Sequence, residues 1–201
     1  YEMGYQHGYL LADQISLMVN RTLLGTAAFI AAQTDTTTKA AMDMLWRGQR
    51  MAEPFLPASC REEIQGIADG ALDAGADVTR EQILLWNTNY DQWCLYVHPG
   101  YWRGCCDPGA GPAVGSGAPG GGCSSFCAWD EWAGGDGRLI FGKNEDNFNL
   151  PEQLERRIMV VADPEGGFGH AFMTYPGMIG LDGGVNERGL EMMTQPSSMR
   201  Q

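Results

Sequence analysis

The sequence is poor in basic residues and in histidine, and these shortages exclude several functions. Its 201 residues include 13 Lys and Arg against 25 Asp and Glu, which gives a formal net charge of −12 at pH 7. An acidic surface repels nucleic acids and anionic membranes, so we expect neither as a partner. The three histidines, His7, His98 and His170, are scattered, and no paired C-x-x-C motifs accompany them. A zinc site is therefore not expected.

Long apolar runs are also missing. No stretch approaches the roughly 20 residues that cross a bilayer as a helix, so we expect no membrane span. The sequence starts at Tyr1 inside a helical pattern and stops at Gln201 just after a strand pattern. We therefore interpret it as a fragment, which leaves the compartment open between secretory, lysosomal and cytoplasmic.

Helical periodicity dominates the first half of the sequence. Apolar residues recur at helical spacing from Tyr5 to Val19, which predicts a helix through about Asn20. A second helix is predicted over residues 38–51, because Pro54 follows shortly and disfavours further helix.

Two capping-box patterns predict the starts of two more helices. Ser59 precedes Glu62 by three residues, and Thr79 precedes Gln82 by three residues. In such a box the first side chain accepts from a backbone N–H of the first helical turn, and the second returns to the cap residue. Apolar residues at helical spacing follow both patterns.

Residues 101–122 are rich in Gly, Pro, Ala and Ser and have no periodicity. Such composition is typical of a flexible linker. It fits a tolerated surface insertion, and it also fits a segment that must move or be cut.

Strand patterns separated by turn residues fill the rest. Three antiparallel hairpins are predicted, with strands at 124–129 and 138–143, 157–162 and 170–175, and 178–182 and 189–194. Helices followed by successive antiparallel strands predict an α+β protein. We divide it into a helical region (1–100), a linker (101–122) and the first part of a catalytic sheet region (123–201).

Cys123 is the candidate nucleophile, because it stands at the start of a strand directly after the glycines. A thiol becomes reactive when a base removes its proton. Cleavage between Gly122 and Cys123 would free an α-amine with a reference pKa of about 7.7–8.0, which can act as that base. Alternatives are a Cys-His pair with His98 or His170, and a small buried residue without catalytic role.

Five motifs in order resemble a known family. They are Tyr1 to Leu11 (YEMGYQHGYLL), Gly66 to Gly70 (GIADG), Gly122 to Phe126 (GCSSF), Phe141 to Asp146 (FGKNED) and Gly184 to Leu190 (GVNERGL). Together they look like the C45 peptidase family of acyl-CoA:6-aminopenicillanate acyltransferases. These are N-terminal-nucleophile (Ntn) hydrolases related to choloylglycine hydrolase and acid ceramidase.

The resemblance implies a four-layer αββα sandwich, autocatalytic cleavage before Cys123 and acyl transfer or hydrolysis at a linear amide of a small molecule. It casts Cys123 as the nucleophile and Asp146 as the residue that orients the freed α-amine. Lys143 stands where many relatives carry arginine, and it keeps a positive charge near the thiolate without the planar guanidinium. Asn144 is expected to brace the same turn. No cofactor or metal is implied, and the cleaved N-terminal segment is a candidate partner.

Other features have simpler interpretations. We expect Cys127, Trp129 and Trp132 to be core or sheet-packing residues, and His7 to make a contact between helices. The lysine at position 143, the linker and the truncated end also fit a non-catalytic binding or structural member of the same fold.

Overall fold

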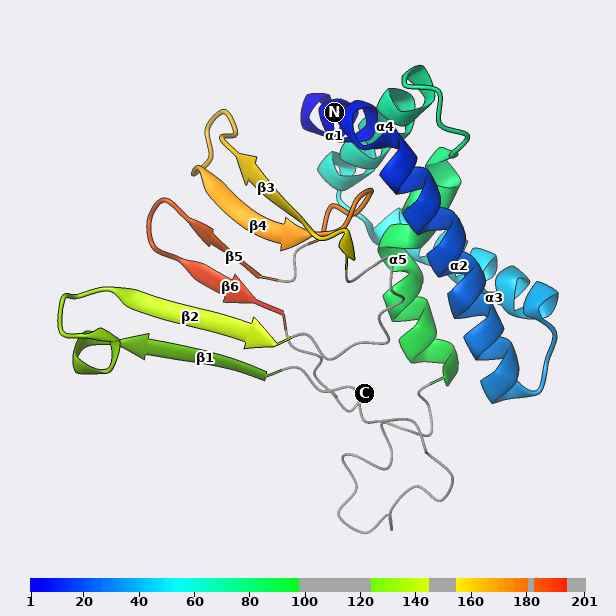
Figure 1. The fold of residues 1–201 in the computed structure, drawn as a ribbon. Helices are drawn as coiled ribbons and strands as arrows, with labels where there is room; N and C mark the ends of the chain where they lie inside the picture. The colour runs from blue at the N-terminus through cyan, green and yellow to red at the C-terminus, as the bar shows by residue number, and fades with distance from the viewer. Residues whose placement is uncertain (98–123, 145–154, 181–182, 195–201) are drawn as a thin grey trace, which may run out of the picture. The chain divides into compact units, whose positions relative to one another are not determined.

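A computed structural model describes residues 1–97, 124–144, 155–180 and 183–194, with the backbone alone described for 90–97 (Figure 1). Within these residues five α-helices precede six strands, and every strand pair is antiparallel, so the predicted α+β class is confirmed. The chain forms two compact units. The helical unit contains the described residues 1–97, 155–157 and 175–180, and the strand unit contains 124–144, 158–174 and 183–194. The αββα layering and the three-part division stay predictions.

The helical unit is built around one apolar core. Its helices are α1 (Glu2–Leu10), α2 (Ala12–Thr34), α3 (Thr38–Ala52), α4 (Ala58–Asp73) and α5 (Arg80–Val97), with a 3₁₀ turn η1 (Glu53–Phe55) after α3. The side chains that these helices bury completely include Ile15, Ile30, Leu45, Ile64 and Leu84. Burial of about 1.5–3 kcal/mol per large aliphatic side chain makes this core the main source of stability in the unit.

The second helix is longer than its sequence pattern predicted. The chain breaks its helical path at Leu11, and α2 then continues to Thr34, so the predicted end near Asn20 is wrong. Buried Leu23, Ala27 and Ile30 continue the apolar stripe at helical spacing, which explains the extension.

Helix α2 also changes the membrane expectation. By length and composition alone it is long and apolar enough to cross a bilayer, so the expectation that no segment reaches this limit is wrong. In the structure 44% of its most apolar window is buried in the protein. The core helix of a protein passes the same test of length and composition, so this finding by itself assigns no membrane span to α2.

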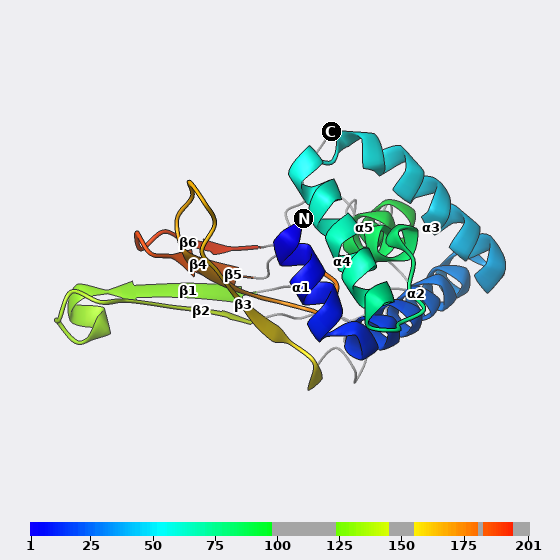
Figure 2. The same ribbon diagram turned by 90° about the horizontal axis from the view of Figure 1, so that it is seen from above.

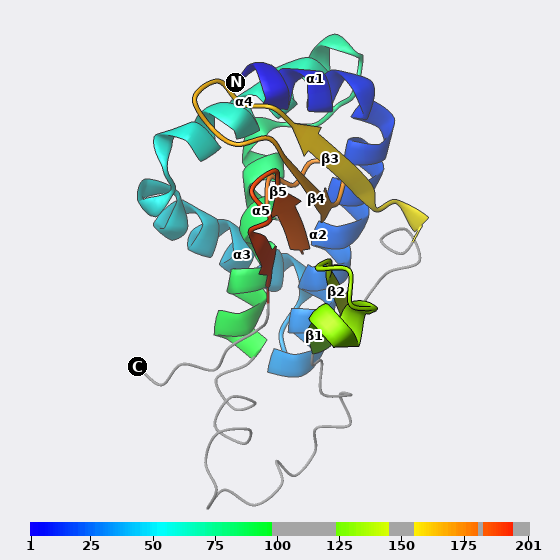
Figure 3. The same cartoon turned by 90° about the vertical axis from the view of Figure 1, so that its left-hand side faces the viewer.

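Four glycines bring α1 and α4 into close contact (Figures 2 and 3). A Cβ atom on Gly4 or Gly8 would overlap the α4 carbonyl oxygens of Glu63 and Ile67, respectively. Gly66 and Gly70 of α4 face the α1 backbone in the same way. Two exposed hydrogen bonds also join this part of the chain to α4. The hydroxyl of Tyr1 donates to Asp69 (2.7 Å), and the hydroxyl of Tyr5 donates to Asp73 (2.8 Å).

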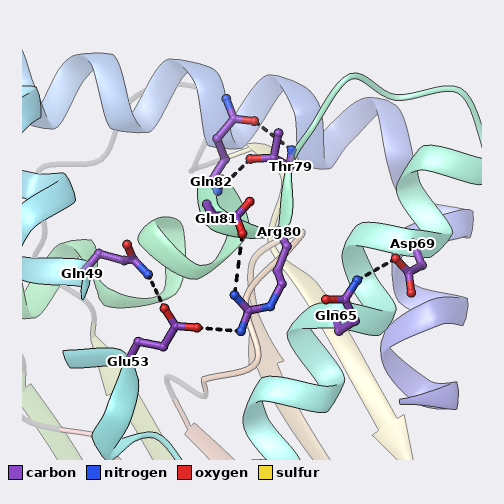
Figure 4. Close-up of polar contacts among 8 residues, drawn as sticks. All are labelled: Gln49, Glu53, Gln65, Asp69, Thr79, Arg80, Glu81 and Gln82. Atoms are coloured by element: carbon purple, nitrogen blue, oxygen red, sulfur yellow. Dashed lines mark hydrogen bonds and ion pairs between the residues drawn. The ribbon is translucent and has the colours of Figure 1, made fainter. Parts of the chain in front are cut away.

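One predicted capping box is confirmed and the other is wrong. At α5 the backbone N–H of Gln82 donates to Thr79 Oγ1 (3.2 Å), and Thr79 N–H donates to Gln82 Oε1 (2.8 Å) (Figure 4). Helix α4 starts at Ala58, one residue before Ser59, after Pro57 and without a side-chain cap. Pro57 itself is the N-cap, with an extended backbone (φ −53°, ψ 147°), so Ser59 already lies inside the helix and cannot serve as its cap.

Polar contacts of partly buried groups join α3, η1 and α5. Arg80 forms an ion pair with Glu53 (2.8 Å), and Gln49 Nε2 donates to the other carboxylate oxygen of Glu53 (3.1 Å) (Figure 4). Partial burial reduces solvent screening of this pair relative to the exposed Lys39–Asp43 pair.

The strand unit contains a hairpin and a four-stranded sheet. Strands β1 (Ser124–Trp129) and β2 (Leu139–Asn144) form the hairpin, with a 3₁₀ turn η2 (Asp130–Ala133) between them. Strands β3 (Ile158–Ala162), β4 (His170–Thr174), β5 (Gly183–Asn186) and β6 (Glu191–Met193) pair in chain order. The first two predicted hairpins are confirmed to within one residue at each strand end.

The third hairpin is shifted from its prediction. Strand β5 starts at Gly183, whereas a strand was predicted over 178–182 and a turn over 183–188. Met178 N–H instead donates to Tyr175 O (3.0 Å), which closes a β-turn. Residues 181–182 lie outside the described residues. The Pro176-Gly177 pair explains the turn, because proline and glycine suit its two central positions.

Candidate active site

The hairpin register places the sequence neighbours of the predicted nucleophile and the predicted aspartate opposite each other. Ser124, which directly follows Cys123, pairs with Asn144, which precedes Glu145 and Asp146. Asn144 Nδ2 also donates to Ser124 Oγ (3.2 Å). This bond joins the two strands at this end of the hairpin, and the role of Asn144 at the catalytic turn stays a prediction. Gly122, Cys123 and Asp146 themselves lie outside the described residues and stay predictions.

Lys143 links the hairpin to the four-stranded sheet. Its Nζ donates to Oγ1 of Thr194 (2.9 Å), the residue that follows β6. In Figure 1, β2 is the hairpin strand on the side of β6. A positive charge is thus held beside the hairpin end that leads toward Cys123. Thr194 was not predicted as a site residue, because no sequence spacing connects it with Lys143.

His170 and Thr194 lie toward opposite ends of the four-stranded sheet. It pairs with Asn186, whereas Met193, the residue before Thr194, pairs with Gly183 three positions along β5. Three residues of strand correspond to about 10 Å. His170 Nδ1 is 2.9 Å from Phe168 O and its ring stacks on Phe172. Since a carbonyl oxygen only accepts, the Nδ1 atom carries the proton.

Neither of the two other histidines is among the described residues of the strand unit. His98 lies outside the described residues, and His7 belongs to the helical unit. Among the side chains that the structure describes, no group of three or more His, Cys, Asp and Glu is arranged to hold a metal ion.

The motif Gly184 to Leu190 has a local structural explanation. Asn186 Oδ1 accepts from the backbone N–H groups of Arg188 and Leu190 (both 3.0 Å), which closes the turn between β5 and β6. Gly189 has a φ of +77°, which favours glycine. Gly184 lies opposite Phe172, and a Cβ there would lie 2.8 Å from Phe172 Cβ. These contacts account for the asparagine and both glycines of the motif.

The hairpin is more exposed than the sequence suggested. Cys127, Trp129 and Trp132 were predicted as core or packing residues, but all three are exposed, Trp132 at 87%. Phe126 is exposed as well. Within the described residues β1 and β2 pair only with each other, as a two-stranded sheet.

Comparisons with known proteins agree with the resemblance. Residues 132–201 match the family described as acyl-coenzyme A:6-aminopenicillanic acid acyl-transferase, so the predicted resemblance is confirmed for this part of the chain. An uncharacterized protein from Archaeoglobus fulgidus is 30% identical over 194 residues, which cover 94% of this chain. The chain spans 30% of the length of that relative.

Proposed function

From this family match we propose that the protein is an autoprocessing N-terminal cysteine amidohydrolase or acyltransferase that acts on a linear amide of a small molecule. The observation that carries the proposal is the register between Ser124 and Asn144, since these residues flank the predicted nucleophile and the predicted aspartate in sequence. The bond between Lys143 and Thr194 adds a fixed positive charge beside the same end of the hairpin.

The first step of the proposed reaction is self-cleavage. The Cys123 thiol attacks the Gly122 carbonyl carbon, its S–C bond forms, and the peptide C–N bond breaks as the nitrogen takes the thiol proton. Water then hydrolyses the thioester. This leaves a carboxylate on Gly122 and a free α-amine and thiol on Cys123.

The second step is turnover. The freed α-amine takes the proton of the thiol, and the thiolate attacks the substrate amide. The amine product leaves with that proton, and water or a second amine releases the acyl group from sulfur. Asp146 orients the α-amine, and Lys143 stabilises the thiolate by its charge. The bond from Asn144 to Ser124 keeps the hairpin end closed.

Intact-mass measurement tests the self-cleavage directly. The native chain should yield two fragments that meet at Gly122 and Cys123, and Cys123→Ala should stay whole. A native chain that never splits, with a Cys123 thiol inert to iodoacetamide, would instead support a non-catalytic member of the fold. Activity that survives blocking of the α-amine but is lost in His98→Ala or His170→Ala would support a Cys-His hydrolase.

The pH dependence of thiol alkylation tests the role of Lys143. In the processed protein, Lys143→Met should raise the pKa of the Cys123 thiol by about 1, because a nearby positive charge favours the thiolate. Lys143→Arg keeps the charge and should leave the profile close to that of the native protein. Equal alkylation profiles for Lys143→Met and native protein would remove Lys143 from the mechanism.

A further inference from the structure

A buried turn from the second half of the sequence belongs to the helical unit. Strand β4 ends at Thr174 and β5 begins at Gly183, and residues 175–180 between them lie among the helices. Tyr175, Pro176 and Gly177 are all buried. The bond from Met178 N–H to Tyr175 O and the φ of +82° at Gly177 are typical of a type II turn.

Two helices recognise both ends of the central peptide group of this turn. Trp86 Nε1 of α5 donates to Pro176 O (3.0 Å), and the N–H of Gly177 donates to His7 Nε2 of α1 (3.0 Å). His7 therefore accepts at Nε2 as a neutral ring, and burial lowers its pKa to about 4. Both polar atoms of the buried peptide group are satisfied by side chains distant in sequence.

Asn87 recognises the next part of the segment. Its Nδ2 donates to Gly177 O (2.8 Å), and its Oδ1 accepts from Ile179 N–H (2.8 Å). The side-chain amide thus bonds to the backbone of the segment in the way that the peptide groups of a neighbouring β-strand do. The remaining Nδ2 proton goes to Ile83 O (2.9 Å) within α5, so the amide has no spare donor. This pairing fixes both the position and the direction of the segment.

Apolar contacts complete the fit. The Tyr175 side chain is part of the helical core, and its ring lies against Trp86 with centroids 6.2 Å apart. Met178 and Ile179 pack against the same core. A Cβ on Gly177 would lie 3.2 Å from Ile15 and 3.3 Å from Trp86, so the site accepts glycine and little more.

We propose that the segment Tyr175–Ile179 is a docking element, recognised by His7, Trp86 and Asn87, through which the N-terminal helices hold the part of the chain that follows the linker once the linker is cut. The proposed function enters only as the source of that cut, between Gly122 and Cys123. The helices lie before this point and the docking element lies after it. The cleaved N-terminal segment thus becomes a non-covalent partner that recognises a Tyr-Pro-Gly turn.

Cleavage by an added protease tests the docking independently of the self-cleavage. The full chain would carry Cys123→Ala and a recognition sequence for a site-specific protease between Gly117 and Ala118. After proteolysis the two fragments should elute together and appear as a 1:1 complex in native mass spectrometry. Fragments that separate at micromolar concentration, each still folded by circular dichroism, would overturn the proposal. The result does not depend on whether Cys123 cuts the native chain.

Variants on both sides of the contact test its residues. Trp86→Phe combined with Asn87→Leu should raise the dissociation constant of the cut fragments roughly 100-fold, since buried hydrogen-bonding groups lose their partners. Asn20→Leu, an exposed change on α2, is the matched control and should leave it unchanged.

Gly177→Ala provides the second test, because it leaves the helical fragment untouched. It should weaken association at least about 10-fold, owing to its positive φ and the close contacts of Ile15 and Trp86. Its control is Gly180→Ala, where nothing lies within 4 Å of an added Cβ. If the helical variants do not fold, this pair decides, and equal dissociation constants for the two would overturn the proposal.

Discussion

The helical unit and the strand unit differ in how completely they bury their apolar side chains. Among the largest fully buried side chains of the described residues, all but Thr174 belong to the helical unit. The strand unit instead exposes large apolar side chains on both of its sheets, including Phe126, Trp129, Met159 and Val161. Stability is therefore concentrated in the helices, whereas the proposed chemistry lies on the strands.

The largest expected effect compares one leucine from each unit. Leu45→Ala should lower the free energy of unfolding by about 3–4 kcal/mol, because Leu45 is fully buried and its removal leaves a cavity. Leu190→Ala in the strand unit should cost less than about 0.5 kcal/mol, because Leu190 is 63% exposed. Urea denaturation of the two variants measures the contrast. If both variants lost the same free energy of unfolding, Leu190 would have to be buried in solution to the same extent as Leu45.

The next effect is a loss of stability in acid that originates in the helical unit. Burial lowers the pKa of His7 from 6.5 to about 4, so below pH 6.5 the unfolded chain binds a proton that the folded chain does not. The contribution is full above pH 6.5 and is lost progressively as the pH falls to about 4. The total loss from this residue reaches up to about 3 kcal/mol.

Urea denaturation of native protein and His7→Gln at pH 7 and pH 4.5 isolates this contribution. Glutamine can still accept from Gly177 N–H but does not titrate, so the variant should lose less stability between the two pH values. A pH dependence identical to that of the native protein would assign the acid sensitivity to other groups.

A smaller effect probes the close contact of α1 and α4. Gly8→Ala should destabilise the chain by about 2–3 kcal/mol, since its methyl group would overlap the carbonyl oxygen of Ile67 and push the helices apart. Gly180→Ala meets no neighbour within 4 Å and serves as the control. Thermal denaturation followed by circular dichroism measures both. A native melting temperature for Gly8→Ala would show that the helices separate without cost.

The smallest effect separates a true helix cap from an apparent one. Thr79→Ala should cost about 1 kcal/mol, because the backbone N–H of Gln82 loses its acceptor. Ser59→Ala should cost close to nothing, since α4 already starts at Ala58 without a side-chain cap. Equal costs for the two substitutions, measured by urea denaturation, would contradict the assigned start of α4.

The sequence predicted best where the cause of a structure is local. The capping box of Thr79 and Gln82 and the first two hairpins were predicted because adjacent residues decide them. The capping box at Ser59 failed for a reason that is also local, since Pro57 starts the helix earlier. The continuation of α2 to Thr34 was missed because that part of the helix is stabilised by burial of Leu23 and Ile30 in the core.

By itself the sequence determined the α+β class, the strands of the first hairpin to within one residue, and the family resemblance whose motifs make Cys123 the candidate nucleophile. Periodicity, turn residues and motif order are properties of neighbouring positions, so they can be read without a fold. Only the tertiary structure decided that Thr194 holds Lys143, and that His7, Trp86 and Asn87 hold the turn at Gly177. These contacts join residues 51 to 170 positions apart, and only the packing of helices and strands brings them within hydrogen-bonding distance.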